Sequence, residues 1–270
     1  MFPNLRTTRK LAVVAILCLV FGTTNRQPRE VATEMDTNQP GHSRWIYTLP
    51  DGSREILDSN DHGKPFDITL PDGSTVKLSF GSSLRYPVVF DSRTRNVILN
   101  GEAAFDIAHS ARGPFIVHTD SAAILVLGTF FNVEAYDSEP MEITLISGSL
   151  RVIEGADTER LQPAEQAVLD DGRLKVHFLH DPREYLSWSD QAPYAHFENK
   201  ELGAVVRHLA RWYRLKVANP GHIRGVPITG DFRLGDPPDV NLKFVNDAEK
   251  HAARISRNGN TFFIGSFHQK

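Results

Sequence analysis

The sequence contains a single cysteine, Cys18, among its 270 residues. One cysteine cannot form an internal disulfide, and it cannot build a zinc site from cysteine ligands. Lysine and arginine together number 30 against 33 aspartates and glutamates, which leaves a net charge of -3. The chain therefore lacks the global positive field that recruits nucleic acid or acidic lipid.

Long apolar runs are also missing. A helix that crosses a bilayer comfortably needs roughly 20 apolar residues, and no run in this sequence reaches that length. An uncharged run, Leu11–Thr24, follows a basic cluster at residues 6–10. Its apolar part of about 12 residues suits a signal-peptide core or a short anchor. Positive charge stays on the cytoplasmic side, so the rest of the chain is expected to be exported. We expect a cytoplasmic tail over residues 1–10 and a signal anchor over residues 11–24, with a cleaved signal peptide or a buried core helix as alternatives.

Residues 25–44 are polar and without apolar period, which predicts a linker. From residue 45 to residue 180, apolar-alternating runs of four to eight residues are separated by turn residues such as Asp-Gly, Asn-Gly and Gly-Ser. Short strands at regular intervals without helical segments predict an all-β sandwich, barrel or solenoid. The string TLPDGS occurs twice, at Thr48–Ser53 and Thr69–Ser74. Two copies are too few for a repeat array, and each predicts a tight hairpin turn.

The apolar period changes in the last third of the chain. Between Leu202 and Tyr213 the apolar residues recur at helical spacing, which predicts a helix of about 13 residues. Asn199 is its expected N-cap, and apolar runs on both sides predict strands. A second strand–helix–strand unit is expected, with its helix over roughly Val240–Arg254. Residues 192–268 therefore predict a small βαβ domain, and the whole chain is expected to be mainly β and then α+β.

Six strings stand in a distinctive order along the β region. They are LPDGSTVKLSFGSSLRYP (70–87), GEAAFDIAH (101–109), PFIVHT (114–119), VLGTFFNVEAY (126–136), ITLISGSLRV (143–152) and LQPAEQAVL (161–169). In this order and spacing they resemble the periplasmic domain of FecR-type sigma-factor regulators. The strings FENKELGAVVRHLARWYRLKV (197–217) and ITGDF (228–232) are similar to the C-terminal domain that many of these regulators carry. The resemblance spans roughly Trp45–Phe267.

The resemblance implies a single-pass inner-membrane regulator, most of which is periplasmic. Its periplasmic part would meet the N-terminal signalling domain of a TonB-dependent outer-membrane transporter and control an extracytoplasmic-function sigma factor inside the cell. It also implies a solenoid-like or sandwich-like FecR domain over residues 45–180, then a βαβ domain that resembles the transporter's signalling domain. Only Met1–Lys10 precede the anchor, too few residues for a sigma-binding domain. We therefore expect an upstream start codon or a sensing half without its output, and a stand-alone periplasmic binding module is the alternative.

Gly128-Thr129 is the one candidate for covalent chemistry. Some members of the family cut themselves at a Gly-Thr bond in this motif, where the threonine hydroxyl attacks the preceding carbonyl and water resolves the ester. A glycine turn between two strands, with threonine favoured by its β-propensity, explains the same two residues.

Other chemistry is not indicated by the sequence. His177 and His180 form an HxxH spacing that strand alternation places on opposite faces. Carboxylates lie on predicted strands at Glu102, Asp106, Glu134 and Glu142. Nothing in their spacing makes them converge, and solvent-facing alternation explains them. No enzyme activity, cofactor or metal is expected, and an exported β-solenoid enzyme acting on polysaccharide is the weakest hypothesis.

Partner contacts are expected on the C-terminal domain. Core packing accounts for part of the helix face, including Leu202. A small βαβ domain also leaves strand edges open, where a partner strand can add. We therefore expect the transporter's signalling domain to dock there, with Phe197, Leu202, Trp212 and Tyr213 as the candidate contact residues.

Overall fold

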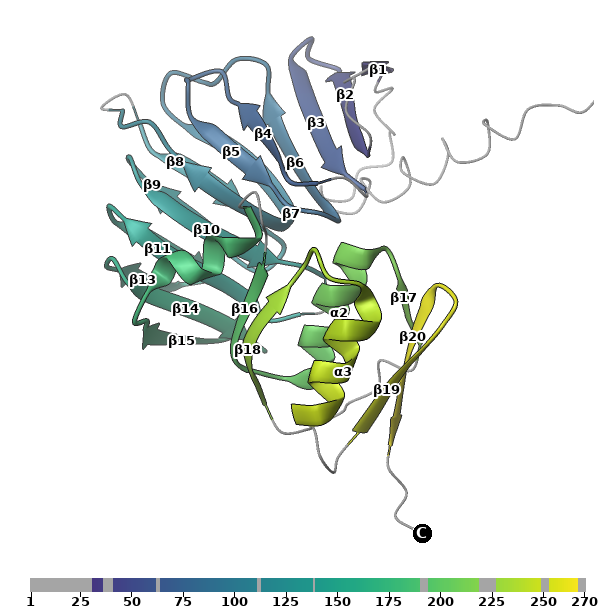
Figure 1. Ribbon diagram of the computed structural model, residues 1–270. Coiled ribbons are helices and arrows are strands. Elements are labelled where there is room, and N and C mark those ends of the chain that lie inside the picture. Colours follow the sequence, from purple (N-terminus) through teal and green to yellow (C-terminus); the bar gives the residue numbers. More distant parts are fainter. Residues whose placement is uncertain are drawn as a thin grey trace, which may run out of the picture.

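The computed structural model describes residues 31–35, 41–61, 64–110, 113–137, 139–189, 194–218, 227–248 and 253–266. Two apolar cores are present: a larger one between Phe66 and Leu169, and a smaller one between Trp188 and Ile264 that also includes Ala104. A β domain and a smaller α+β domain surround them (Figure 1). The mainly β character expected from the sequence is confirmed. The predicted anchor, residues 11–24, lies outside the described residues, and no helix within them has the length and apolar character to cross a membrane.

The β domain is built from fifteen strands. They are β1 (Val31–Met35), β2 (His42–Thr48), β3 (Arg54–Asn60), β4 (Phe66–Thr69), β5 (Thr75–Leu78), β6 (Ser82–Pro87), β7 (Arg95–Asp106), β8 (Phe115–His118), β9 (Ala123–Val126), β10 (Phe130–Ala135), β11 (Met141–Ser147), β12 (Leu150–Glu154), β13 (Asp157–Leu161), β14 (Glu165–Asp170) and β15 (Arg173–Phe178). β1 and the start of β2 lie inside the predicted linker, so that prediction is wrong for these residues. Pairing of β1 with β2 and of β2 with β3 satisfies their backbone groups without an apolar period in the sequence.

Strand β7 joins two sheets into one sandwich. Its first half pairs with β6 and β8, and its second half pairs with β5 and β10. One sheet has the order β1-β2-β3-β6-β7-β8-β9-β12-β13 and the other β4-β5-β7-β10-β11-β14-β15. All neighbours are antiparallel except β7 and β8, which favours the sandwich over the solenoid. Gly101, with φ of 95°, lies where β7 passes between sheets, and a Cβ there would lie 2.4 Å from Ser82 Oγ.

The two TLPDGS copies form the same turn, as predicted. Gly52 and Gly73 have φ of 85° and 84°, a conformation that glycine adopts at no steric cost. In each copy the aspartate carboxylate accepts a hydrogen bond from the serine backbone amide, at 2.9 Å and 3.0 Å. The second copy has further contacts: Asp72 accepts from Arg95 at 2.7 Å, and the Ser74 hydroxyl accepts from the backbone amide of Ala108 at 3.0 Å. This turn is thereby tied to the centre of the β domain.

The α+β domain follows a short 3-10 helix, η2 (Pro182–Ser189). Its elements are β16 (Tyr194–Lys200), α2 (Leu202–Tyr213), β17 (Lys216–Ala218), β18 (Ile228–Arg233), α3 (Pro238–Ala248), β19 (Ala253–Asn258) and β20 (Thr261–Ser266). β16 and β18 form a two-stranded sheet, and β17-β20-β19 form a three-stranded sheet in which β17 is parallel to β20. Both helices contact strands of both sheets and lie between them (Figure 1).

The helix ends differ from those expected. Asn199 lies inside β16 with φ of 53°, and the residue at the N-cap is Glu201, which makes no side-chain capping bond. The prediction of Asn199 as N-cap is therefore wrong. α3 ends at Ala248, earlier than predicted, and its Asn246 amide both donates to and accepts from the backbone of Ile255 at 2.8 Å. Ile255 belongs to β19, and this amide bridges the helix to that strand.

Candidate functional site: the interface between the two domains

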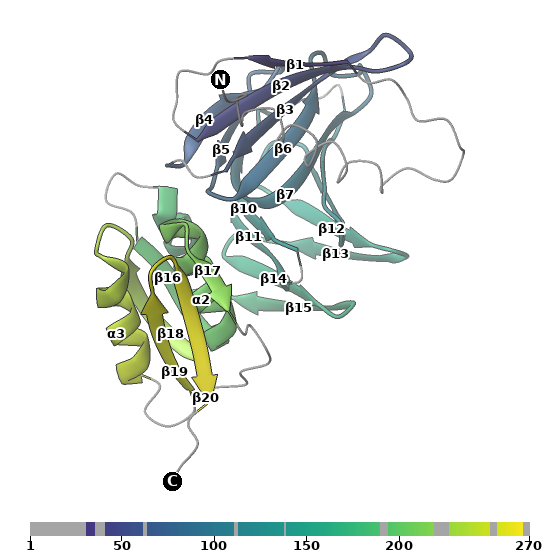
Figure 2. The same ribbon diagram turned by 90° about the vertical axis from the view of Figure 1, so that its right-hand side faces the viewer.

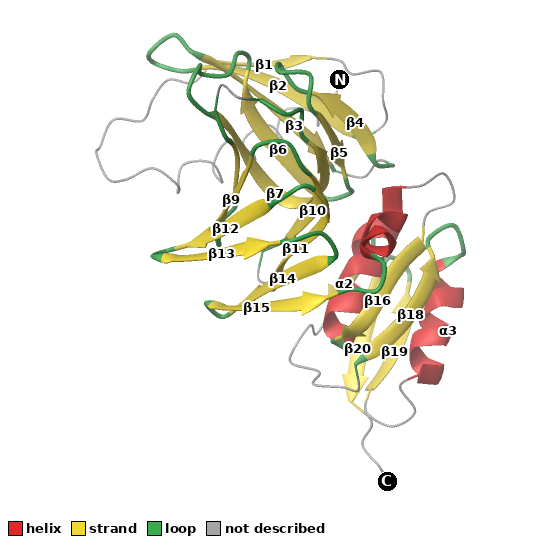
Figure 3. Cartoon of the chain, turned by 90° about the vertical axis from the view of Figure 1, so that its left-hand side faces the viewer, coloured by secondary structure: helices red, strands yellow, loops and turns green. Residues whose placement is uncertain are grey.

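Helix α2 lies against the outer face of the second sheet of the sandwich. Figure 3 shows α2, rather than α3, on the side facing the β domain. In the second half of β7, Ala103 and Phe105 belong to the larger core, whereas Ala104 belongs to the smaller one. A strand buried on both faces needs a second layer over it. The two domains therefore share one strand as a packing surface.

Three glutamates lie side by side on this covered face. Glu102 of β7 is in register with Glu134 of β10, and Glu134 is in register with Glu142 of β11. Glu102 is only 3% exposed. The prediction that these carboxylates face solvent and do not converge is wrong for these three, because the α+β domain covers the face that alternation assigns to them. Asp106, at the end of β7, is exposed as expected.

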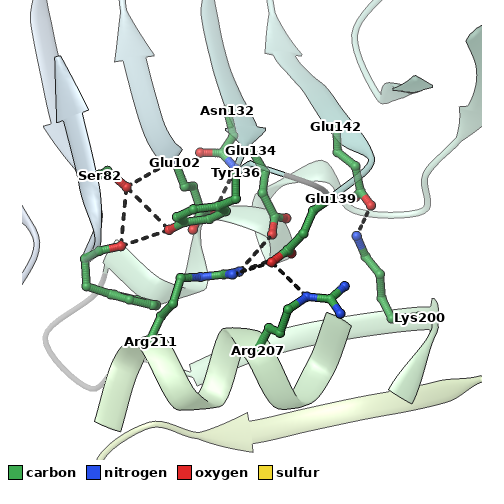
Figure 4. A network of polar contacts seen from close by, with 11 residues as sticks. Ser82, Glu102, Asn132, Glu134, Tyr136, Glu139, Glu142, Lys200, Arg207 and Arg211 are labelled. Carbon is green, nitrogen blue, oxygen red and sulfur yellow. Dashed lines mark hydrogen bonds and ion pairs between the residues drawn. The ribbon is translucent and has the colours of Figure 1, made fainter. Parts of the chain in front are cut away.

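Two arginines of α2 hold a fourth carboxylate, that of Glu139. Arg207 Nε donates to Glu139 Oε1 at 2.9 Å, and Arg211 Nη1 donates to the same oxygen at 2.5 Å (Figure 4). The Glu139 side chain is 6% exposed, so this ion pair is largely shielded from solvent. Residues four apart on a helix share a face, and two cations there repel unless an anion lies between them. We call Glu139, Arg207 and Arg211 the clasp.

Arg211 also contacts Tyr136. Its guanidinium carbon lies 3.6 Å from the centroid of the Tyr136 ring, a cation–π contact, and one of its nitrogens lies 3.7 Å from Glu134. The Tyr136 hydroxyl donates to the backbone oxygen of Phe80 at 2.9 Å. A planar guanidinium can stack and form ion pairs at once, which a lysine cannot do as well. Arg211 thus contacts both β10 and the loop that follows it.

A second ion pair flanks the clasp. Lys200, at the end of β16, contacts the carboxylate of Glu142. Gln166 of β14 donates to the other oxygen of Glu142 at 3.2 Å and to Thr144 Oγ1 at 3.0 Å. Each carboxylate of the covered face therefore has a cation or an amide beside it, as buried charges require.

Two buried titratable groups lie in this interface, Glu102 on β7 and His208 on α2. Burial, and secondly the charge of Glu134, raises the pKa of Glu102 to about 8. Asn132 Nδ2 donates to the Glu102 carboxyl at 3.1 Å. Burial, and secondly the charge of Arg211, lowers the pKa of His208 to about 3. At neutral pH Glu102 is mainly protonated and His208 is neutral, so the centre of the interface carries little net charge.

Aromatic contacts complete the interface. The Phe80 ring, from the β5–β6 turn, lies edge-on to Trp212 and His208, with centroids 4.8 Å and 5.4 Å apart. Edge-on aromatic pairs contribute beyond the area that they bury. Phe80 itself is buried.

The four candidate partner residues lie in or beside the core of the α+β domain. Phe197 and Leu202 are buried. Trp212 and Tyr213 are half-buried, and their polar atoms donate to the backbone oxygens of Leu234 and Asp236, each at 2.7 Å. Phe197 and Leu202 therefore present no surface to a partner, and Trp212 faces the β domain. The prediction that a partner docks on this domain stays a prediction.

A cavity of about 30 Å³ lies within the interface. Its lining mixes polar and apolar groups and includes Glu102, Asn132, Trp188 and His208. Such a volume holds one or two water molecules, whereas pockets for organic ligands are roughly ten times larger. In this arrangement the converging glutamates have no room for a sugar ring. Nor does any group of three or more His, Cys, Asp or Glu side chains in the described part of the chain lie where it could hold a metal ion.

Gly128 and Thr129 lie in the turn between β9 and β10. A Cβ on Gly128 would lie 2.8 Å from both Cα and Cβ of His109, so only glycine fits. The Thr129 hydroxyl donates to the backbone oxygen of Ser149 at 2.9 Å. These contacts account for both residues as turn and packing positions, while self-cleavage at this bond stays a prediction.

The sequence reasoning missed Glu139, Arg207 and Arg211. One signal was present: two arginines four residues apart on a predicted helix, on a face beside the apolar stripe. Their shared acceptor is 68 and 72 residues away in sequence, and no local pattern identifies such a partner.

Comparison with known proteins agrees with this architecture. Residues 60–151 match the family model described as FecR protein. The chain is similar to two crystal structures of a "putative anti-sigma factor" from Parabacteroides distasonis. The first is 26% identical, with 79% of this chain and 100% of that chain covered and a TM-score of 0.72. The second is 27% identical, with 78% and 99% covered and a TM-score of 0.71. No curated protein matches the chain.

The ion pair between Glu139 and Arg211 in the clasp is expected to stabilise the folded protein. A double-mutant cycle with Glu139→Ala and Arg211→Ala should give a coupling of about 1–3 kcal/mol in the free energy of unfolding, because the charges are shielded from solvent. The matched control is the exposed pair of Asp239 and Arg257, which lies 3.1 Å apart and should couple by less than about 1 kcal/mol. Urea denaturation measures both cycles. Equal coupling in the two would contradict the role of the clasp.

Glu102 is expected to make the fold less stable in alkali. Its pKa is raised in the folded state, so the folded chain holds a proton that the unfolded chain has already lost, and stability falls as the pH rises towards 8. Between pH 7 and 8.5, where His208 is neutral, the free energy of unfolding should fall by about 1 kcal/mol. Glu102→Gln should remove this fall, whereas Glu159→Gln on exposed β13 should keep it. A Glu102→Gln protein with the parental pH slope would refute the assignment.

Self-cleavage between Gly128 and Thr129 has a direct test. Intact mass spectrometry of the purified chain would show two fragments that sum to the whole plus one water, and Thr129→Ala would abolish them. A chain that stays intact after prolonged incubation would leave only the turn role for these residues.

Proposed function

Residues 60–151 of this chain form a FecR-family domain, and from this premise we propose that the protein is the sensing part of a sigma-factor regulator. It would receive a signal outside the inner membrane and control an extracytoplasmic-function sigma factor inside. The likeness to two structures of an anti-sigma factor over nearly four-fifths of the chain supports this role. The apolar run at residues 11–24, with basic residues before it, supports a single-pass anchor.

The observation that carries the proposal is the clasped interface. A relay needs an element that both receives and passes on a change, and α2 meets this need. One face of α2 forms the core of the α+β domain, through Val205, Val206 and Leu209. Its arginines bind a loop of the FecR domain. A partner that shifts α2 would pull on Glu139 and on the strands beside it.

The incoming partner in this proposal is the N-terminal signalling domain of a TonB-dependent outer-membrane transporter. It would dock on the α+β domain. Within the described residues β18 pairs only with β16, and β19 pairs only with β20. Such strand edges accept an added strand. Figure 3 shows α3 as the helix farther from the β domain, and its residues Val240 and Phe244 are 51% and 48% exposed and offer apolar contact.

Transcript profiling tests the relay in the cell. RNA is compared among the parent strain, a strain without the gene, a Glu139→Ala strain and an Asp239→Ala control strain. Loss of the gene should change a small set of transcripts several-fold, including one for an outer-membrane transporter. Glu139→Ala should change the same set because it opens the clasp, and Asp239→Ala should leave the set at the parental level.

Unchanged transcripts in the deletion strain would refute the relay. A chain that still bound a purified transporter signalling domain in that case would be the stand-alone binding module. If the deletion changed transcripts but Glu139→Ala did not, the regulator would be real and the clasp would not carry its signal.

A further inference from the structure

Strand β15 ends the second sheet of the sandwich. It pairs with β14 in unbroken register from Arg173 to Phe178, and with no other strand in the described residues. Figures 1 and 2 both show it as the last strand of its sheet, beyond β14 and away from β7. The outer side of such a strand presents backbone N–H and C=O groups that another strand can pair with.

One face of β15 is apolar and extends past the core. Leu174 and Val176 lie opposite Leu169 and Ala167, two residues of the larger core. Phe178 continues the same face, since side chains alternate along a strand. Val176 is 39% exposed and Phe178 is 78% exposed. An aromatic ring this exposed at the end of a core face is unusual for a surface that only meets water.

The other face of β15 is basic. It carries Arg173, Lys175 and His177, all exposed. Opposite them on β14 stand Asp170, Val168 and Gln166, so β14 offers this row one carboxylate. Neither Arg173 nor Lys175 forms an ion pair with any described residue. A strand added beside β15 would therefore meet apolar side chains on one face and positive charge on the other.

We propose that β15 is a docking edge for an extended segment of another protein in which apolar and acidic residues alternate. The apolar residues of that segment would cover Val176 and Phe178 and continue the core. Its acidic residues would stand opposite the basic row. Backbone hydrogen bonds supply affinity in this mode of recognition, and the alternating side chains supply specificity. This surface belongs to the β domain, beyond the residues 60–151 that match the family model, and is separate from the clasp and from the α+β domain.

A second copy of this chain does not fit the same edge. Antiparallel pairing of two β15 strands about a two-fold axis brings Lys175 opposite Lys175 or His177 of the other copy. Like charges directly opposite each other destabilise strand pairing. Basic residues on an edge are a common means of preventing self-association. The basic row of β15 thus opposes self-pairing and leaves the edge open to an acidic strand.

Strand β13, the edge of the first sheet, makes a useful contrast. Glu159 and Asp157 are exposed, and they lie opposite Val152 and Glu154, on the side of β13 that Leu161 turns to the core. Charges on this side protect an edge, because an added strand that continued the core would have to bury them. β13 and β15 lie at the same end of the sandwich (Figure 2). One of the two edges is protected by its charges, and the other exposes an apolar row.

Binding of two synthetic peptides to the full chain tests the proposal. The probe is a seven-residue peptide that alternates glutamate with valine, and its control alternates lysine with valine. The glutamate peptide should bind about ten-fold more tightly by fluorescence polarisation, because the cross-strand charge pairs with Arg173 and Lys175 are attractive for glutamate and repulsive for lysine. It should also slow amide hydrogen exchange in β15.

Variants locate the site. The double variant Arg173→Glu with Lys175→Glu should bind the lysine peptide more tightly than the glutamate peptide. Phe178→Ser should weaken binding of the glutamate peptide several-fold. The matched control, Arg151→Glu with Arg160→Glu, reverses an exposed cross-strand arginine pair at the other edge and should change nothing. The proposal would be overturned if both peptides bound equally, or if the charge reversal at Arg173 and Lys175 left the preference for the glutamate peptide unchanged. A dimer in sedimentation that Phe178→Ser dissociates would also overturn it, because the occupant would then be a second copy.

Discussion

A carboxylate removed from water needs its charge balanced nearby, and Glu139 meets that need with two arginines of a single helix. The rest of the interface follows from this requirement. Because α2 must lie over Glu139, it also covers the row of glutamates on β7, β10 and β11. Coverage raises the pKa of Glu102 and lowers that of His208, so both groups are mainly neutral where the two domains meet. At the centre Glu102 is neutral because it holds a proton and His208 is neutral because it has lost one, whereas the charged groups at the periphery are paired.

Strand β7 connects this interface to both sheets of the β domain. It belongs to both sheets of the sandwich, and alternate residues of its second half belong to the cores of the two domains. A displacement of α2 would therefore act on a strand that runs through the whole β domain. Gly101 lies at the midpoint of β7, where the close approach of Ser82 leaves no room for a side chain. Close-packed interiors transmit such displacements instead of absorbing them, which suits the relay proposed above.

Local features of the fold were predictable from local chemistry. The two TLPDGS turns and α2 follow from glycine conformation, proline geometry and helical spacing, and the structure has them where they were expected. Predictions failed where a distant contact overrode a local preference. Asn199 is a good N-cap residue, yet its backbone amide donates to Thr229 Oγ1 at 2.9 Å within β16. The last turn expected in α3 is replaced by the bridge from Asn246 to Ile255. β1 and β2 form without an apolar period because their pairing needs only backbone groups.

The sequence by itself determined the strand-rich region, the helical face of α2, and the order of motifs that resembles the FecR family. Strand alternation also assigned Glu102, Glu134 and Glu142 to one face of a sheet. Only the tertiary structure decided what covers that face, and so whether the three carboxylates are solvated or buried. The reason is physical: alternation depends on neighbouring residues, whereas the cations beside Glu134 and Glu142 are Arg211 of α2 and Lys200 of β16, which lie 58 or more residues further along the chain. The exposed row on β15 is the converse case, because an apolar face becomes a surface only where no described strand lies beside it.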